Sequence, residues 1–460
     1  MRDSMNLYLR GECIEPSIVP LSFGGAFYVS RTSYSPYRGL REYGPYERIR
    51  YMRIWYLKPR ELTDSLKEAL DKMLEVIEEN LKVFLKVPNY EIEPIKMDEN
   101  LNVNSLRKVF KNYITDVTDK ENLILLVPIF RRYGYSSYET YVMLKVLSLE
   151  YGVPSQVYTE RTLNVATQKG RKFPLFNLSL NIFAKVGGIP WVLAEDLGYD
   201  LIVGFNWCFY REGKERVGPL NKVFAYANIF KERGVWAGLL TCIAEEQEYI
   251  DALCTLLETA IRRYTLTTMR FKDRYEILIM SSKILKQEEI QVLRREIEEK
   301  YDNISLTIAQ ITDATDIRMY DSTTEHYMAP RGSYFFLDYD TVIYLSTGII
   351  SVPYDEIIKE LSIGTPVPIK IKLLYPCNRK RIDSNVRRLK KIVKCCHMLT
   401  AMNWRSLKGY IRLPTPLHYS KCIAKFVRNA VSFTPLSRIF IKMGEIYKPK
   451  EPLDKRPWFI

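Results

Sequence analysis

The sequence predicts an α/β fold with more than one domain. A chain of 460 residues usually forms two to four domains of roughly 150 residues each, and a hydrophobic content of 47% is ample for ordinary cores. Apolar, strand-like segments alternate with amphipathic, helix-like segments, and neither internal repeats nor low-complexity stretches interrupt them. This alternation favours sheets that are covered by helices.

The first series of elements lies between residues 48 and 159. A strand is expected over 48–57 and a long amphipathic helix over 60–84. The apolar run at 122–130 predicts a buried strand, 136–152 predicts a second helix, and 154–159 predicts a short strand. Strand, helix and strand in close succession indicate a parallel βαβ sheet.

A second series of elements follows, and we place the boundary between the two series near Pro190. The expected elements are strands at 200–206, 221–230 and 234–241, a helix at 244–264, a strand at 275–281, a helix at 286–300 and a strand at 304–312. Three early strands, one helix and then strand–helix alternation is the order of an RNase H-like sheet.

The positive charge of the chain is concentrated near its C-terminus. The formal net charge is +14, yet residues 361–460 carry 22 Lys and Arg against 4 Asp and Glu, which leaves a net charge of −4 for the first 360 residues. Apolar residues recur at helical spacing over 382–398, and Arg387 and Arg388 belong to the cationic flank of this predicted helix. One such helix could simply be a solvated face. A surplus over a whole region favours a polyphosphate partner such as nucleic acid.

Other classes of protein fit the sequence poorly. The N-terminal residues carry charges every few positions, and no apolar run reaches the roughly 18 residues of a membrane span, so we expect a cytoplasmic protein without signal peptide or anchor. The eight cysteines are scattered without a CxxC motif, which indicates reduced thiols. Three separated histidines argue against a histidine metal centre.

Four residues could together bind a terminal phosphate. Tyr141 and Lys145 lie on one face of the helix predicted at 136–152, Gln156 follows in the short strand, and Lys185 precedes a Gly-Gly pair. An ammonium, an amide and a phenol near a flexible turn supply the hydrogen-bond donors that a phosphate needs. Taken singly, residues of these types are more often surface side chains, loop amides or helix C-terminal cations.

The ordered set resembles a known family. The Tyr-x3-Lys pair, the Gln after a short strand and the run FNLSLNIFAKVGGIPW, followed by an RNase H-like series, are similar to the MID and PIWI domains of Argonaute proteins. The chain is too short for the amino-terminal and PAZ domains of a long Argonaute, so it resembles a short prokaryotic Argonaute. The resemblance implies an N-terminal segment at 1–40, a Rossmann-like MID domain at 41–190 and an RNase H-like PIWI domain at 191–460.

The resemblance also assigns roles to the phosphate-binding candidates. It implies that Tyr141 stacks on the first guide base, while Lys145, Gln156 and Lys185 hold the guide 5′ phosphate. Asn181 and the C-terminal carboxylate on Ile460 would lie near a bound Mg²⁺ or another divalent ion. The apolar ending RPWFI suits such a buried tail, although a tail packed for stability alone would look the same.

The same resemblance implies an inactive nuclease site. RNase H-like nucleases use acidic side chains to hold two metal ions, and the corresponding positions here are Asn206, Ser282 and Lys421. Lys421, like Arg387 and Arg388, could instead contact phosphates in a nucleic-acid channel. If the alignment is displaced by a few residues, other carboxylates could serve, namely Asp196, Asp200 or Asp273.

The expected function is therefore recognition without cleavage. The resemblance implies a guide, most readily RNA, that pairs with a target, most readily DNA, in antiviral or anti-plasmid defence. It also implies an associated protein in place of the absent domains and an effector protein, including one that acts at a membrane. Two other functions stay open, a guided endonuclease with displaced carboxylates and a nucleic-acid-binding protein that uses no guide.

Overall fold

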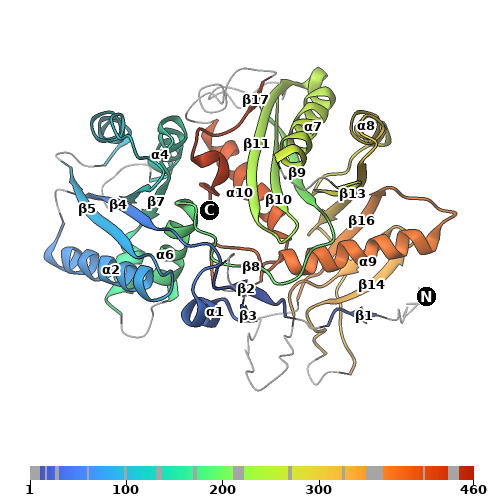
Figure 1. Ribbon diagram of the computed structural model, residues 1–460, viewed down its shortest axis with the longest axis horizontal. Coiled ribbons are helices and arrows are strands. Elements are labelled where there is room, and N and C mark those ends of the chain that lie inside the picture. Colours follow the sequence, from blue (N-terminus) through green and yellow to red (C-terminus); the bar gives the residue numbers. More distant parts are fainter. Residues whose placement is uncertain are drawn as a thin grey trace, which may run out of the picture.

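A computed structural model describes residues 11–15, 18–25, 31–59, 62–97, 101–130, 137–168, 173–210, 222–267, 272–323, 327–348, 366–407, 410–431, 433 and 445–460. Figure 1 shows two sheet-based regions side by side, with the C-terminus between them. The large sheet and its helices extend to the right of the C-terminus, and the smaller sheet lies to its left.

The smaller sheet has four parallel strands within the described residues, in the order β5 (Asn89–Lys96), β4 (Tyr51–Lys58), β6 (Leu123–Pro128) and β7 (Ser155–Tyr158). All residues of β6 are buried. Ile124 and Leu126 face a core shared with α2 (Asp64–Val83) and α6 (Phe173–Lys185). Leu123, Leu125 and Val127 face a second core with α3 (Val103–Val109) and α4 (Ser137–Tyr151). Because helices cover both faces, β6 is continuously apolar, and the predicted parallel βαβ sheet is confirmed.

The larger sheet has ten strands among the described residues and contains the predicted RNase H-like order. Its centre is formed by β9 (Leu201–Tyr210), β10 (Lys222–Lys231), β11 (Trp236–Glu245), β12 (Tyr275–Ser281) and β13 (Ile304–Thr312). The first three strands are antiparallel, and β12 runs parallel to both β9 and β13.

Helices cover both faces of this central region. α7 (Tyr249–Thr267) and α8 (Gln287–Leu293) pack into the core on one face, and α9 (Ile382–Leu399) and α10 (Thr415–Ala430) pack into the core on the other. The second of these cores also contains α2 and α6 of the smaller sheet. The two sheets therefore share one continuous hydrophobic core.

Further strands extend the sheet beyond the predicted series. β14 (Ser333–Asp338), β15 (Thr341–Tyr344) and β16 (Ile369–Tyr375) continue it past β13, while β1 (Glu12–Cys13) and β17 (Ile446–Tyr447) form its ends. A separate three-stranded sheet contains β3 (Arg31–Ser33), β2 (Leu21–Phe23) and β8 (Val192–Leu193). The remaining short elements are α1 (Pro36–Tyr43), α5 (Glu160–Ala166), the π-helical turns Phe110–Ile114 and Arg294–Glu299, and the 3₁₀ turns Glu246–Glu248 and Leu453–Lys455.

Two predicted boundaries were wrong for identifiable reasons. β9 does not end at Asn206 but continues to Tyr210, because β10 pairs with it along its whole length whereas β12 pairs only as far as Phe205. α7 begins at Tyr249 rather than at residue 244, since β11 runs to Glu245 and a 3₁₀ turn intervenes. The helix predicted over 286–300 is present within one residue at each end, as α8 continued by the π-helical turn Arg294–Glu299.

The domain boundaries at residues 40 and 190 stay a prediction. Pairing in the structure crosses both of them, since β1 joins β14 in the larger sheet and β2 pairs with β8. All eight cysteines are free thiols. Nowhere in the described part of the chain is a helix both long and apolar enough to span a bilayer.

Gly204 in β9 allows α10 to lie close to the sheet, and this contact should be sensitive to one methyl group. A Cβ at Gly204 would lie 2.5 Å from the Pro416 carbonyl oxygen, which is backbone and cannot rotate away. We expect Gly204→Ala to lower the free energy of unfolding by about 2 kcal/mol, as overpacking of a core commonly does. Urea unfolding measures this change. Gly11→Ala is the control, because the nearest atom to its Cβ would be 3.7 Å away; equal stability of the two variants would contradict the prediction.

Candidate functional site

Two buried lysines from different helices meet at the edge strand of the smaller sheet. Lys145 lies on α4 and Lys185 is the last residue of α6. The Nζ atoms of Lys145 and Lys185 donate to the same backbone carbonyl, that of Ser155 in β7, at 2.7 and 3.1 Å. Both side chains are almost fully buried, with exposures of 3% and 1%.

Gln156 and Tyr141 complete a group that we call the lysine cluster, consisting of Tyr141, Lys145, Gln156 and Lys185. The amide oxygen of Gln156 accepts from Lys185 Nζ at 2.7 Å, and its amide nitrogen donates to the Val157 carbonyl at 3.1 Å. The Tyr141 ring centroid is 5.8 Å from Lys145 Nζ. The structure therefore brings together all four residues that the sequence marks for phosphate binding.

The electrostatics of the lysine cluster are unusual for a protein interior. Neither lysine forms an ion pair with a carboxylate in the described residues. Burial lowers the pKa of Lys145 to about 8. The pKa of Lys185 is also lowered well below its usual value, first by burial and then by the charge of Lys145. An anion brought to this position would be attracted by both ammonium groups and would raise both pKa values.

Arg405 adds a third positive charge, which the sequence prediction missed. Its charge contributes to the lowered pKa of both lysines. Burial is the main cause of the lowered pKa of His418, which is about 4, and the charge of Arg405 is the second cause. Its guanidinium donates to the Cys422 sulfur at 3.2 Å. The signal available in the sequence was its place in the basic C-terminal region, directly after Trp404.

The C-terminal tail is buried beside the lysine cluster. The Trp458 carbonyl accepts from Lys145 Nζ at 3.4 Å. The Trp458 ring packs edge-on against Phe426 of α10, and Phe459 packs in the same way against Tyr419. Ile460 is 6% exposed. The last residues of the chain thus connect α10 to the lysine cluster, and the tail is buried, as expected for the apolar ending RPWFI.

Asn181 lies on α6 one helical turn before Lys185. Its side-chain oxygen is buried and has no hydrogen-bond partner in the structure. An orphaned amide oxygen of this kind is a suitable ligand for a hard divalent cation such as Mg²⁺. Elsewhere in the described residues, no three His, Cys, Asp or Glu side chains are grouped to hold a metal ion.

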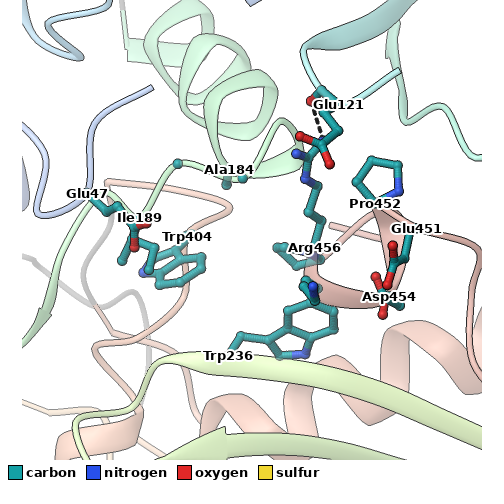
Figure 2. A pocket seen from close by; sticks show the side chains of 14 residues that line it. Glu47, Glu121, Ala184, Ile189, Trp236, Trp404, Glu451, Pro452, Asp454 and Arg456 are labelled. Atoms are coloured by element: carbon teal, nitrogen blue, oxygen red, sulfur yellow. Dashed lines mark hydrogen bonds between the residues drawn. The ribbon is translucent and has the colours of Figure 1, made fainter. Parts of the chain in front are cut away.

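A separate cavity of about 290 Å³ lies between the end of α6 and the tail (Figure 2). It is lined by Gly187 and Gly188, by Trp236 and Trp404, and by tail residues that include Arg456. Burial lowers the pKa of Arg456 to about 10, and its guanidinium donates to the Glu121 carbonyl. No member of the lysine cluster lines this cavity, so the two sites are distinct.

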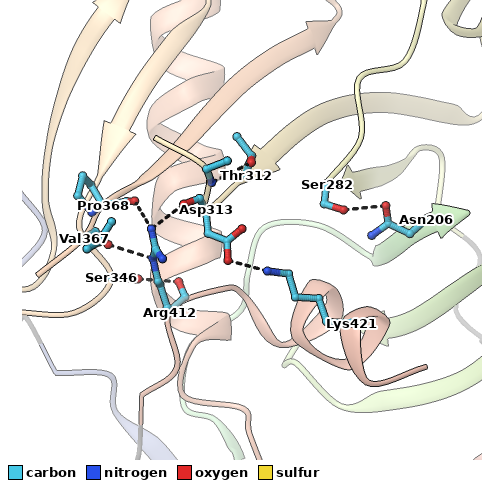
Figure 3. A network of polar contacts seen from close by, with 10 residues as sticks. Asn206, Ser282, Thr312, Asp313, Ser346, Val367, Pro368, Arg412 and Lys421 are labelled. Carbon is cyan, nitrogen blue, oxygen red and sulfur yellow. Dashed lines mark hydrogen bonds and ion pairs between the residues drawn. The ribbon is translucent and has the colours of Figure 1, made fainter. Parts of the chain in front are cut away.

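The predicted nuclease positions lie within β9 (Asn206), directly after β12 (Ser282) and on α10 (Lys421), as Figure 3 shows. Ser282 Oγ donates to Asn206 Oδ1 at 2.8 Å, so an amide and a hydroxyl satisfy each other there. Lys421 Nζ forms an ion pair with Asp313 at 2.6 Å. Arg412 donates to the backbone carbonyls of Asp313, Val367 and Pro368 and so fixes the segment that carries this carboxylate.

Comparisons with known proteins identify the family of this chain. The Piwi domain family model matches residues 128–432. The chain belongs to the Piwi family. A Piwi protein of Archaeoglobus fulgidus is 22% identical over 440 residues, which covers 92% of this chain and 93% of that protein. The argonaute of Aquifex aeolicus is 27% identical over 310 residues, covering 65% of this chain and 37% of that protein.

Solved structures show the same Piwi fold. A Clostridium butyricum Argonaute bound to a guide DNA and a target DNA has a TM-score of 0.66 at 16% identity, covering 99% of this chain and 55% of that one. Drosophila Piwi has a TM-score of 0.65 at 14% identity, and the match covers 98% of this chain and 56% of that one. This chain therefore spans about half the length of these solved chains. The likeness confirms an α/β fold with an RNase H-like Piwi domain.

Asp313 is a carboxylate of the Piwi domain that the sequence prediction missed. It directly follows β13, the strand next to β12, and this position after a buried strand was a visible signal. The alternative carboxylates lie elsewhere. Asp200 precedes β9, where it pairs with Lys272 and accepts from the Glu276 amide, and Asp273 precedes β12. Because β9 and β12 are parallel, both lie at the end of the sheet opposite to Ser282.

The cations of α9 divide into two groups. Lys390, Lys391 and Lys394 pair with the carboxylates of Glu12, Glu276 and Glu195 and so hold the helix to neighbouring segments of the Piwi fold. Arg387 is exposed, and Arg388 is partly buried and donates to Ser384 Oγ. These lysines are paired but remain partly exposed, so the solvated-face interpretation stays open for them, and the channel role of the arginines stays a prediction.

The buried charge of Lys145 should make stability depend on pH. Its pKa is about 8 in the folded state against roughly 10.4 in an unfolded chain, so the unfolded state binds more protons between these values and stability rises with pH there. Lys145→Met removes the charge. We expect this variant to have a higher free energy of unfolding than the wild type at neutral pH, by on the order of 2 kcal/mol. The difference between the two free energies should shrink as the pH rises to about 10.

Chemical denaturation across this pH range measures the effect of Lys145→Met. Lys111→Met is the matched control, because Lys111 is exposed. A stability difference that stays constant with pH would show that Lys145 is not buried as a charge.

Proposed function

We propose that this Piwi chain recognises nucleic acid through a guide strand whose 5′ phosphate binds at the lysine cluster. The observation that carries the proposal is that Lys145 and Lys185, both buried, share one carbonyl and pair with no carboxylate in the described residues. A buried charge without a counterion is costly. A phosphate supplies several acceptor oxygens to both ammonium groups.

Each member of the cluster has a distinct role in this proposal. Lys145 and Lys185 supply the charge, and the Gln156 amide donates a further hydrogen bond after rotating from Val157. The Tyr141 ring is placed to stack on the first base. Asn181 Oδ1 and the carboxylate of Ile460 would hold a divalent ion such as Mg²⁺, which neutralises part of the phosphate charge when bound.

We infer further that the chain does not cut its target. Two-metal nucleases need carboxylates, whereas the predicted positions here present an amide, a hydroxyl and an ammonium. Asp313 is a nearby carboxylate, but the ammonium of Lys421 already neutralises it. A fixed ammonium at this position also repels metal ions.

The resemblance to short prokaryotic Argonautes supports the wider role. We propose an RNA guide and a DNA target, with pairing supplying the sequence specificity as in other guided systems. Target binding would be passed to an associated protein and an effector in antiviral or anti-plasmid defence, within the cytoplasm. Among the solved relatives, one Argonaute carries a guide DNA with a target DNA and another an externally bound siRNA.

The 5′-phosphate assignment predicts a selective loss of binding. Lys145→Ala with Lys185→Ala removes two charge-assisted hydrogen bonds, each worth roughly 1.5–3 kcal/mol. We expect the affinity for 5′-phosphorylated guides to fall by at least about a hundredfold, with little change for 5′-hydroxyl guides. Fluorescence anisotropy measures both.

The matched control is Lys96→Ala with Lys111→Ala, which removes two exposed lysines from the same region. If the cluster variant weakens phosphorylated and hydroxyl guides equally, the phosphate assignment is wrong.

The inactivity proposal is tested with the unmodified protein, a guide, a complementary strand and Mn²⁺. We expect no cut, and none after Asn206→Asp alone, because Ser282 and Lys421 still leave too little negative charge for two metal ions. The triple variant Asn206→Asp, Ser282→Asp and Lys421→Asp supplies the carboxylates with which target cleavage could return. Guide binding persists in the single variant and in the triple variant. A specific cut by the unmodified protein would overturn the proposal.

A further inference from the structure

The cavity between the C-terminal tail and the end of α6 is lined by buried donors that the described part of the chain leaves unpaired. We call this cavity of about 290 Å³, shown in Figure 2, the tail cavity. Trp236, at the start of β11, and Trp404, between α9 and α10, both line it. The two residues are 5% and 3% exposed, and neither indole N–H has a hydrogen-bond partner among the described residues. A buried donor without an acceptor is unfavourable.

Arg456 adds a positive charge to the interior of the tail cavity. Its guanidinium is partly buried and donates to the backbone carbonyl of Glu121. The buried carboxylate of Asp454 also lines the cavity, but it is bound by Arg263 at 3.2 Å. The interior therefore presents two indole N–H groups and a guanidinium, which together suit a negatively charged acceptor such as a carboxylate.

The rim of the tail cavity has the opposite charge. Glu47, Glu121 and Glu451 are exposed residues that line it, against one exposed cation, Lys455. Figure 2 shows the three glutamates at separate places around Arg456. A molecule that enters the cavity thus meets carboxylates first and the donors of the interior second.

These two layers of charge select the class of ligand. A simple anion, or the backbone of a nucleic acid, would suit the interior but would be repelled by the rim, and a simple cation would meet the reverse situation. A zwitterion that enters with its carboxylate first matches both layers. The apolar part of the wall favours an apolar side chain on this zwitterion. That part consists of Ala184, Ile189, Pro452 and Pro457.

The tail cavity is also large enough for a ligand. One water molecule occupies about 30 Å³ in the liquid, so the cavity has roughly ten times the room that one bridging water needs. Small-molecule sites in proteins begin at about 300 Å³. Water alone is the competing occupant.

We propose that the tail cavity binds a free α-amino acid with an apolar side chain. The carboxylate of this ligand accepts from Trp236, Trp404 and Arg456, and its ammonium group faces the glutamates of the rim. Because Gly187 and Gly188 line one side of the cavity and residues of the tail line another, the bound molecule holds the tail against the end of α6. Binding needs no guide strand and does not depend on the function proposed for the lysine cluster.

The first test measures the binding of L-leucine to the full chain by titration calorimetry. N-acetyl-leucine, which lacks the ammonium group, and leucinamide, which lacks the carboxylate, are the matched probes. We expect each of them to bind at least about tenfold more weakly than leucine, because each loses one set of charge-assisted interactions. If leucine does not bind, or if the three probes bind equally, the cavity holds water only and the proposal is overturned.

Two tryptophan variants locate the bound leucine. Trp236→Phe with Trp404→Phe removes both N–H groups and keeps aromatic rings in place, so we expect the affinity for leucine to fall at least about tenfold. Trp55→Phe is the matched control, because Trp55 Nε1 donates to Glu93 outside the tail cavity. Equal affinities of the double variant and the control would contradict the proposal.

A second pair of substitutions changes exposed side chains only and therefore avoids the core. Glu47→Gln with Glu121→Gln should reduce the preference for leucine over N-acetyl-leucine several-fold, since the rim then repels an anion less. Glu75→Gln with Glu288→Gln is the control, because both residues are exposed and neither lines the tail cavity. A preference that is the same in both pairs would overturn the proposal.

Amide hydrogen exchange gives an independent measure of where leucine binds. Leucine should slow exchange in residues 445–460 of the wild type and not in the double tryptophan variant. Unchanged exchange in the wild-type tail would mean that leucine binds elsewhere, and the proposal would fall. All of these measurements are made without a guide strand, so their failure leaves the function proposed for the lysine cluster standing.

Discussion

One backbone carbonyl, that of Ser155, joins several elements at the lysine cluster. Lys145 and Lys185 donate to it from two helices, and Lys145 also donates to Trp458 in the C-terminal tail. An edge strand of the smaller sheet, two of its helices and the end of the chain are thereby fixed at one point. Burial lowers the pKa of both lysines, and the charge of Lys145 lowers that of Lys185 further, so holding both charges there is unfavourable without a counterion.

The C-terminal tail links the lysine cluster, at the edge of the smaller sheet, to the larger sheet. Trp458 and Phe459 pack on aromatic residues of α10, and α10 lies against β9, where Gly204 permits the close approach. The core on this side is continuous through both sheets. Packed side chains therefore link the lysine cluster to β9 and α10, which carry two of the predicted nuclease positions.

The sequence predicts elements well where burial leaves a clear pattern. The continuous apolar run of β6 identified a strand covered on both faces, and β12 and β13 matched their predicted bounds. β5 was not predicted, because it is an edge strand with largely exposed residues and a proline at residue 94. β1 and β8 were not predicted, because two-residue strands are defined by partners far away in the chain.

The same limit applies to the site. Tyr141, Lys145, Gln156 and Lys185 were predictable because their order along the chain resembles a family pattern, and spacing on a helix follows from sequence. Arg405 and Asp313 each had a weak signal in the sequence, but their importance comes from a neighbour that only the fold supplies. Arg405 lies in a different element from the lysines whose pKa it lowers, and Asp313 matters through Lys421, more than a hundred residues later.

Lys421 and Lys185 illustrate two opposite uses of a cation in this molecule. Lys421 has a carboxylate partner in Asp313, so its charge is compensated within the chain and the surrounding site needs no ion or phosphate to be stable. Lys185 has a carbonyl and an amide as partners, so its hydrogen bonds are satisfied while its charge is not. Hydrogen bonding alone cannot distinguish these cases, but the balance of charge can. By that criterion the region around the predicted nuclease positions is balanced within the described residues, whereas the lysine cluster is not, and this difference in charge is the physical basis of the function that we propose for the cluster.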